Sequence, residues 1–284
     1  TATINNSGSI RTYDGNGSGD AINISYLDSA EVNNSGSLYS YDNNGIDIYD
    51  VGTVTINNDR TGDITGYWYD GIYIEDADTV DITNAGSIYS YDYDGIGIIG
   101  AGKVTITNNA GGTIQADSSD GVYAEDVDEL TIDNSGTIDG GYAGIETWDV
   151  GDLDITNSGN ITADIRGIEI YGQDGMSATV TNNEGGLIES EAAQPLAFWD
   201  VGSVTVNNAG TIRGGQEGIL INGSEFGGTK SATVINEATG VIEGHGGHDF
   251  FGSEGVAIYL NSYAYDAELD ATVGSATTAT VTNA

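Results

Sequence analysis

Apolar and polar residues alternate along short segments that recur through the whole chain. Residues 80–88 read Val-Asp-Ile-Thr-Asn-Ala-Gly-Ser-Ile, and residues 130–138 read Leu-Thr-Ile-Asp-Asn-Ser-Gly-Thr-Ile. A second kind of segment begins with glycine, as in Gly-Ile-Asp-Ile at 45–48 and Gly-Ile-Glu-Ile at 167–170. Because successive side chains of a strand point to opposite faces, this alternation predicts strands with Val and Ile facing inward and polar residues facing outward.

An asparagine two places after the last apolar residue of the first segment marks every copy. These residues are Asn6, Asn34, Asn58, Asn84, Asn108, Asn134, Asn157, Asn182, Asn208, Asn236 and Asn283. The first nine spacings are 23 to 28 residues and the tenth is 47, so the asparagines predict ten stacked turns. Each asparagine continues the inward phase of its strand. We therefore expect its amide to turn into a corner and bond the equivalent amides above and below, in a structural ladder.

This strand-rich repeat favours one fold class. The chain has no 3.6-residue periodicity, which excludes helical solenoids, and it lacks the Leu-x-x-Leu-x-Leu frame of leucine-rich repeats. We predict an all-β, right-handed, three-sided parallel β-helix of about ten turns of ~26 residues. Residues 1–284 would form a single domain whose last turn, at about 237–283, carries large insertions. With turns roughly 4.8 Å apart, the rod would be on the order of 50 Å long.

The composition narrows the range of partners. The chain has 44 acidic and 6 basic residues, for a formal net charge of −38 at pH 7. Nucleic acid is excluded as a partner because phosphate binding needs clustered Lys and Arg. No apolar run is long enough to span a bilayer, so direct membrane insertion is not expected. So acidic a surface suits a medium rich in salt or divalent cations, although solubility alone would also explain it.

Three phrases carry a resemblance to a known family. They are Thr-Asn-Ala-Gly-Ser-Ile at 83–88, Asp-Asn-Ser-Gly-Thr-Ile at 133–138 and Asn-Asn-Ala-Gly-Thr-Ile at 207–212. These phrases resemble the passenger repeats of bacterial autotransporters and related large adhesins. The resemblance implies a β-helix that is exported and displayed on the bacterial cell surface. Proteins of that family include adhesins and structural rods, and a minority carry enzymatic domains.

Acidic residues recur at one aligned position, two residues beyond the second strand. They are Asp50, Asp76, Asp126, Asp149 and Asp200. Carboxylates stacked about 5 Å apart repel one another, and a hard cation would relieve that repulsion. Calcium accepts six to eight oxygen ligands in flexible geometry. We therefore predict Ca²⁺ sites on this ladder, with an unliganded acidic corner as the alternative, because neither an EF-hand loop nor the glycine-aspartate nonapeptide is present.

Tyrosines form a stripe in the first four turns. Each lies three places after the apolar residue that follows the asparagine and glycine of its turn, and they are Tyr13, Tyr41, Tyr67 and Tyr91. A stacked aromatic ladder stabilises neighbouring turns by itself, and an exposed one also offers a contact surface for sugar rings or a partner protein. Both interpretations of the stripe stay open.

The only histidines lie in the long insertion. His245, His248 and Asp249 have a spacing that could share a metal, with a flexible glycine-rich loop as the alternative. Phe250 and Phe251, together with Tyr259, Tyr263 and Tyr265, predict a docking surface in the same turn. No Gly-x-Ser-x-Gly elbow and no Cys nucleophile occurs, so we expect no enzyme.

The pattern as a whole predicts an extracellular structural or adhesive rod. Its expected partners are further copies of itself, stacked head to tail into a filament, or other cell-surface proteins and glycans. No cofactor is required, and Ca²⁺ is the one candidate, as a cation that strengthens the rod. The alternative function is a β-helix that binds or cleaves polysaccharide.

Overall fold

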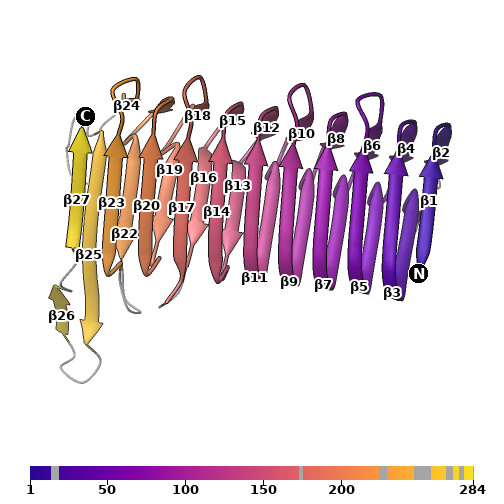
Figure 1. Cartoon of the computed structure of the whole chain (residues 1–284), viewed down its shortest axis with the longest axis horizontal. Helices are drawn as coiled ribbons and strands as arrows, with labels where there is room; N and C mark the ends of the chain where they lie inside the picture. Colours follow the sequence, from indigo (N-terminus) through magenta and orange to yellow (C-terminus); the bar gives the residue numbers. More distant parts are fainter. Residues whose placement is uncertain are drawn as a thin grey trace.

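The computed structural model describes residues 1–13, 19–172, 175–223, 229–245, 257–266, 271–274 and 278–283. Over these residues the chain is a parallel β-helix whose turns stack in a row (Figure 1). No helix occurs among the described residues. Nine regular turns separate Asn6 from Asn236, and β23 then pairs with β27, where Asn236 lies opposite Asn283. The predicted all-β parallel fold is confirmed.

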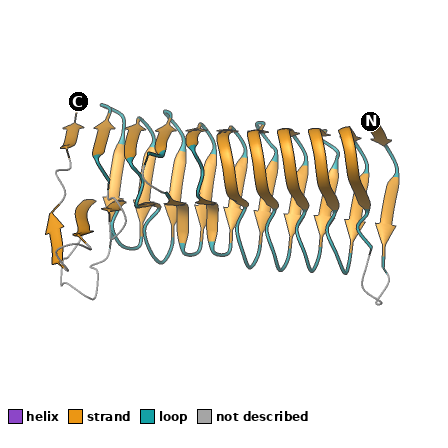
Figure 2. Cartoon of the chain, turned by 90° about the horizontal axis from the view of Figure 1, so that it is seen from below, coloured by secondary structure: helices purple, strands orange, loops and turns teal. Residues whose placement is uncertain are grey.

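Each turn has three faces. In the N-terminal turns one long, bent strand covers the first and second faces, and in the later turns two separate strands do so (Figure 2). The long strands are β3 (Ile22–Asn34), β5 (Ile46–Asn58), β7 (Ile72–Asn84), β9 (Ile96–Asn108) and β11 (Val122–Asn134). The later first-face strands are β13 (Ala143–Trp148), β16 (Arg166–Tyr171), β19 (Leu196–Trp199) and β22 (Ile219–Gly223).

The remaining strands complete the second and third faces. The second face adds β1 (Ala2–Asn6), β14 (Asp152–Asn157), β17 (Ser177–Asn182), β20 (Ser203–Asn208), β23 (Ser231–Asn236) and β27 (Thr278–Asn283). The third face consists of β2 (Ser9–Thr12), β4 (Ser37–Ser40), β6 (Asp63–Gly66), β8 (Ser87–Ser90), β10 (Thr113–Ala116), β12 (Thr137–Gly140), β15 (Asn160–Ala163), β18 (Leu187–Ser190), β21 (Thr211–Gly214) and β24 (Val241–Gly244). In the last turn β25 (Ile258–Asp266) pairs with β22 and forms an antiparallel pair with β26 (Ala271–Gly274).

Aligned apolar residues fill the interior of the coil. Ile56, Ile82, Ile106 and Ile132 lie directly above one another on the second face, and none is exposed. Burying each such side chain contributes about 1.5–3 kcal/mol. The period-two alternation therefore becomes a continuous hydrophobic column along the rod.

The asparagines form a second, polar column at the corner between the second and third faces. Asn34 Nδ2 donates to Asn58 Oδ1 at 2.9 Å, Asn58 Nδ2 donates to Asn84 Oδ1 at 2.8 Å, and the same bond continues through every turn to Asn236. A Cβ at Gly62 would lie 2.1 Å from Asn58 Oδ1, so this corner requires glycine. The recurrent Asn and Gly thus hold one corner of the coil together.

Candidate functional site

Aromatic rings gather at the corner that follows the third face. Tyr41, Tyr67 and Tyr91 come directly after β4, β6 and β8 and stack face to face, with ring centroids 5.2 and 4.9 Å apart. Trp68 lies edge-on to all three rings, with centroid distances of 5.1, 5.9 and 6.3 Å. Tyr41, Trp68 and Tyr91 each remain 38–39% exposed. We call these four residues the aromatic corner.

Tyr13, predicted on the same stripe, makes its ring contact with a different tyrosine. Its ring lies 5.7 Å from that of Tyr39, which is on the outward side of β4. Tyr13 is 63% exposed, so it lies beside the aromatic corner rather than in the stack. The use of these rings as a contact surface stays a prediction.

The aligned aspartates lie where the chain bends from the first face to the second. Asp50, Asp76, Asp126, Asp149 and Asp200 all have positive φ, between 51° and 57°. Asp tolerates this left-handed conformation better than most residues, which explains why it recurs at the bend. In the turn between Asp76 and Asp126 the bend residue is Gly100, with φ 67°.

Asp50, Asp76 and Asp126 line a polar groove along this bend, together with Asp78 and Asp128. Among the described residues, no group of three or more His, Asp or Glu is arranged to hold a metal ion. The backbone therefore accounts for the acidic ladder, and the calcium sites stay a prediction.

A glycine precedes the first-face strand in most turns, and the residue directly before that glycine forms a ladder that the sequence pattern did not predict. The Asp70 N–H donates to Asn44 Oδ1 at 3.0 Å, and the Asp94 N–H donates to Asp70 Oδ1 at 2.8 Å. The same bond continues from the Asp120 N–H to Asp94 at 3.0 Å and from the Ala143 N–H to Asp120 at 2.8 Å. The repeated Asn-Gly and Asp-Gly dipeptides at 44–45, 70–71, 94–95 and 120–121 are the signal that could have revealed it.

A cavity of about 390 Å³ opens on the first face beside this ladder. Tyr73, Gly97 and Tyr123 lie in register on consecutive strands, so the missing side chain of Gly97 leaves a gap between two tyrosines. Tyr69 and Tyr93 stack on each other with centroids 5.1 Å apart and also line the cavity. The other lining residues are Asn43, Asn44, Asp70, Asp94 and Ile99. We call this space the Gly97 cavity.

The carboxyl groups beside the cavity are buried in an acidic neighbourhood. Burial, and then the nearby Asp94, raises the pKa of Asp70 to about 8. Burial, Asp94 and a hydrogen bond to Glu146 raise the pKa of Asp120 to about 10. Burial also raises the pKa of Asp94 itself. Asp70 and Asp120 therefore carry protons at neutral pH, because a desolvated carboxylate without a cation is costly.

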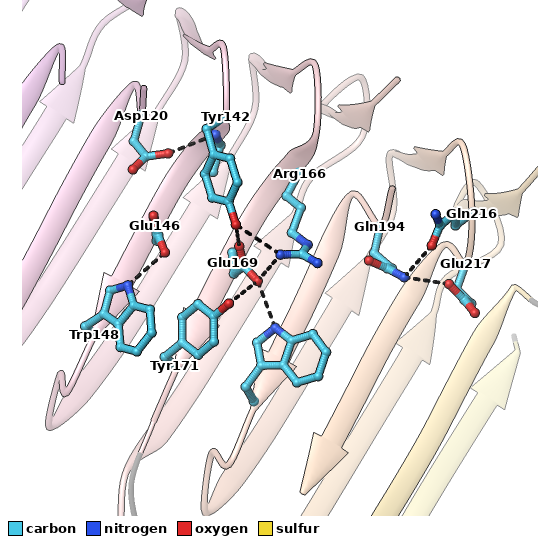
Figure 3. Close-up of polar contacts among 12 residues, drawn as sticks. Asp120, Tyr142, Glu146, Trp148, Arg166, Glu169, Tyr171, Gln194, Gln216 and Glu217 are labelled. Carbon is cyan, nitrogen blue, oxygen red and sulfur yellow. Dashed lines mark hydrogen bonds and ion pairs between the residues drawn. The ribbon is translucent and has the colours of Figure 1, made fainter. Parts of the chain in front are cut away.

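Two turns beyond Asp120, the same face holds a completed ion pair (Figure 3). Glu169 is fully buried and pairs with the Arg166 guanidinium. Its carboxylate also accepts hydrogen bonds from Tyr142 at 3.1 Å, Tyr171 at 2.8 Å and Trp199 at 2.9 Å. The Arg166 guanidinium lies 5.8 Å from the Trp199 ring centre, within cation–π range. We call these five residues the Glu169 cluster.

Part of the predicted last-turn surface lies outside the described residues. His248, Asp249, Phe250 and Phe251 are among the residues left out, as are the side chains of Tyr263 and Tyr265. His245 is described, and its Nε2 lies 3.4 Å from Glu243 Oε2. The predicted metal site and docking surface of this turn stay predictions.

The fold and its stacked ladders define a parallel β-helix protein. Residues 44–194 match the family described as the right handed beta helix region, so the chain belongs to this family. The match agrees with the predicted right-handed coil. No curated protein and no solved structure matches the chain. In the part of the chain that the structure describes, no helix could cross a membrane.

Proposed function

We propose that this chain is the rod of an adhesive protein on the outside of a bacterial cell and that it binds polysaccharide through the aromatic corner. The observation that carries the proposal is the stack of Tyr41, Tyr67 and Tyr91 with Trp68 against it, held in partly exposed positions by rigid, paired strands. Exposed aromatic rings in a fixed array are typical of contact surfaces. The resemblance to autotransporter passengers supports the location.

The surroundings of the aromatic corner favour a glycan as the partner. Asp42, Asn43 and Asp92 lie beside the rings in sequence and offer carboxylates and an amide for hydroxyl groups. A net charge of −38 repels polyanions, so the expected ligands are neutral or cationic polysaccharides. The proposal includes no catalytic step.

Binding of immobilised neutral and amino polysaccharides tests the proposal. Trp68→Ser should weaken binding by about tenfold, because a large amphipathic ring would leave the contact surface. The matched control is Tyr49→Ser, since Tyr49 is 36% exposed and stacks edge-on with Tyr26 instead. Equal binding by both variants, with unchanged thermal unfolding, would contradict a role for the aromatic corner.

A further inference from the structure

The ladder position before the glycine that opens each first-face strand holds an acidic residue in some turns and an arginine in another. Asp70, Asp94 and Asp120 occupy it in three consecutive turns, and Arg166 occupies it two turns later. At Arg166 a cation meets a buried carboxylate and aromatic rings, all from this chain. At Asp70 the carboxyl group and the rings are present, and no Lys or Arg lines the Gly97 cavity. In register, Asp70 stands at the position of Arg166 and Gly97 at the position of Glu169, so the Gly97 cavity has a carboxyl group and aromatic rings but no cation from this chain.

One oxygen of Asp70 has no partner among the described residues. Asp70 is only 6% exposed, and its Oδ1 accepts the Asp94 N–H at 2.8 Å. Its Oδ2 lies 3.5 Å from the place that a Cβ would take at Gly97 and accepts no hydrogen bond. A carboxyl oxygen at the wall of a cavity is stabilised by a donor placed in that cavity, and most strongly by a charged one.

We infer that the Gly97 cavity binds the ammonium group of an amino sugar. The ammonium would donate to Asp70 Oδ2, and the rings of Tyr73 and Tyr123 would enclose it from either side. The cavity, at about 390 Å³, has room for a pyranose ring, and the amides of Asn43 and Asn44 offer hydrogen bonds to its hydroxyls. That the ammonium belongs to a sugar rests on the proposed glycan adhesion. That the cavity binds an ammonium group does not depend on that proposal.

Binding of an ammonium ligand should change the number of protons bound at this site. Burial and Asp94 raise the pKa of Asp70 to about 8, so the empty site is mostly protonated at neutral pH. A bound ammonium favours the ionised carboxylate and lowers that pKa. Binding at neutral pH should therefore release protons, which a neutral ligand would not cause.

Isothermal titration of the full chain with glucosamine, in phosphate and in HEPES buffer, measures both affinity and proton release, because neither buffer contains a primary ammonium. N-Acetylglucosamine is the matched neutral ligand, since it keeps the ring and removes the charge. We expect glucosamine to bind about tenfold more tightly than N-acetylglucosamine and to release protons. Equal affinity for the two sugars would overturn the ammonium site while leaving adhesion at the aromatic corner in place.

Two variants locate the site. Gly97→Val fills the cavity, since a Cβ there meets its nearest atoms at 3.4–3.5 Å, an ordinary contact. Asp70→Asn keeps an Oδ1 acceptor for the Asp94 N–H and removes the group that can ionise. Both should abolish glucosamine binding while thermal unfolding stays cooperative. The control is Asp81→Asn, which removes one charge from an exposed outward position of β7 on the second face.

The remaining outcomes separate the two proposals. If n-butylamine binds as tightly as glucosamine, the amino-sugar assignment is wrong. Unchanged glucosamine binding in Gly97→Val, or no binding by the unaltered chain, would overturn the site. Conversely, glucosamine binding that survives Trp68→Ser, together with no polysaccharide binding by the unaltered chain, would support the cation site and contradict the proposed adhesion.

Discussion

The Gly97 cavity and the Glu169 cluster lie on the same face of one rod, built from the same repeat positions. In the Glu169 cluster a buried carboxylate has an arginine and three hydrogen-bond donors. In the Gly97 cavity a buried carboxyl group keeps a proton and faces open space. The comparison teaches that the backbone of the coil stays the same from turn to turn. The outward side chains of a few turns determine whether the space there is filled by the chain itself or is open to a ligand.

Removing the arginine from the Glu169 cluster should have the largest effect on stability. Arg166→Leu leaves the Glu169 carboxylate buried without a countercharge, and we expect the free energy of unfolding to fall by about 3–5 kcal/mol. Chemical denaturation measures the loss. Adding Glu169→Gln should restore much of it, because the buried charge is gone. A loss below about 1 kcal/mol would show that the pair is not needed.

The asparagine column should matter equally in both regions. Asn108 and Asn182 are fully buried, and each donates at 2.9 Å to the asparagine of the next turn. Asn108→Ala and Asn182→Ala should each cost about 2–3 kcal/mol, because the neighbouring amides lose their partners. Denaturation of the two variants side by side checks this. Clearly unequal losses of stability would contradict the idea that the asparagine column supports both regions in the same way.

The carboxyl groups beside the Gly97 cavity should make stability depend on pH. The pKa of Asp70 is about 8 in the folded chain against 3.8 for an ordinary Asp, so the folded state holds more protons between these values. The contribution of Asp70 to stability is then fully present below pH 4 and is lost as the pH rises towards 8, and the raised pKa of Asp120 acts in the same direction. Asp70→Asn should flatten this slope and stabilise the chain at alkaline pH by roughly 2 kcal/mol. Melting temperatures across pH measure the slope, and an unchanged profile would contradict the assignment.

Filling the cavity should have the smallest effect. Gly97→Val should raise the free energy of unfolding by about 0.5–1 kcal/mol, because glycine weakens a strand and valine favours one. Gly86→Val is the contrast, since a Cβ there would lie 2.2 Å from the Gly62 carbonyl oxygen. It should destabilise the chain. Thermal unfolding of both variants checks this, and a loss in Gly97→Val would mean that the cavity cannot accept a side chain.

The fold could be predicted from the sequence because its determinants recur at a fixed phase. The corner asparagines and the alternating Ile and Val residues specify the stacking without knowledge of contacts. The aspartate ladder was visible too, although the positive φ of residues such as Asp50 supplies a backbone reason for it.

The two sites of the first face could not be predicted in the same way. Arg166 looked like one of several scattered arginines. The two rings that it contacts, Tyr142 and Trp199, lie one turn away on either side. Gly97 looked like an ordinary strand residue. Turn lengths of 23 to 28 residues hide which outward side chains become neighbours, and only the register of the strands reveals it.

The asparagine column also affects how the dipoles add up at its corner of the rod. Each side-chain amide donates towards the C-terminal end, as Asn34 does to Asn58. At the same corner the backbone bonds run the other way, since the Asp59 N–H donates to the Asn34 carbonyl and the Ala85 N–H to the Asn58 carbonyl, both at 2.8 Å. The two sets of dipoles oppose each other, whereas those of an α-helix add up. This corner can therefore gain turn after turn without its dipoles adding up along the rod.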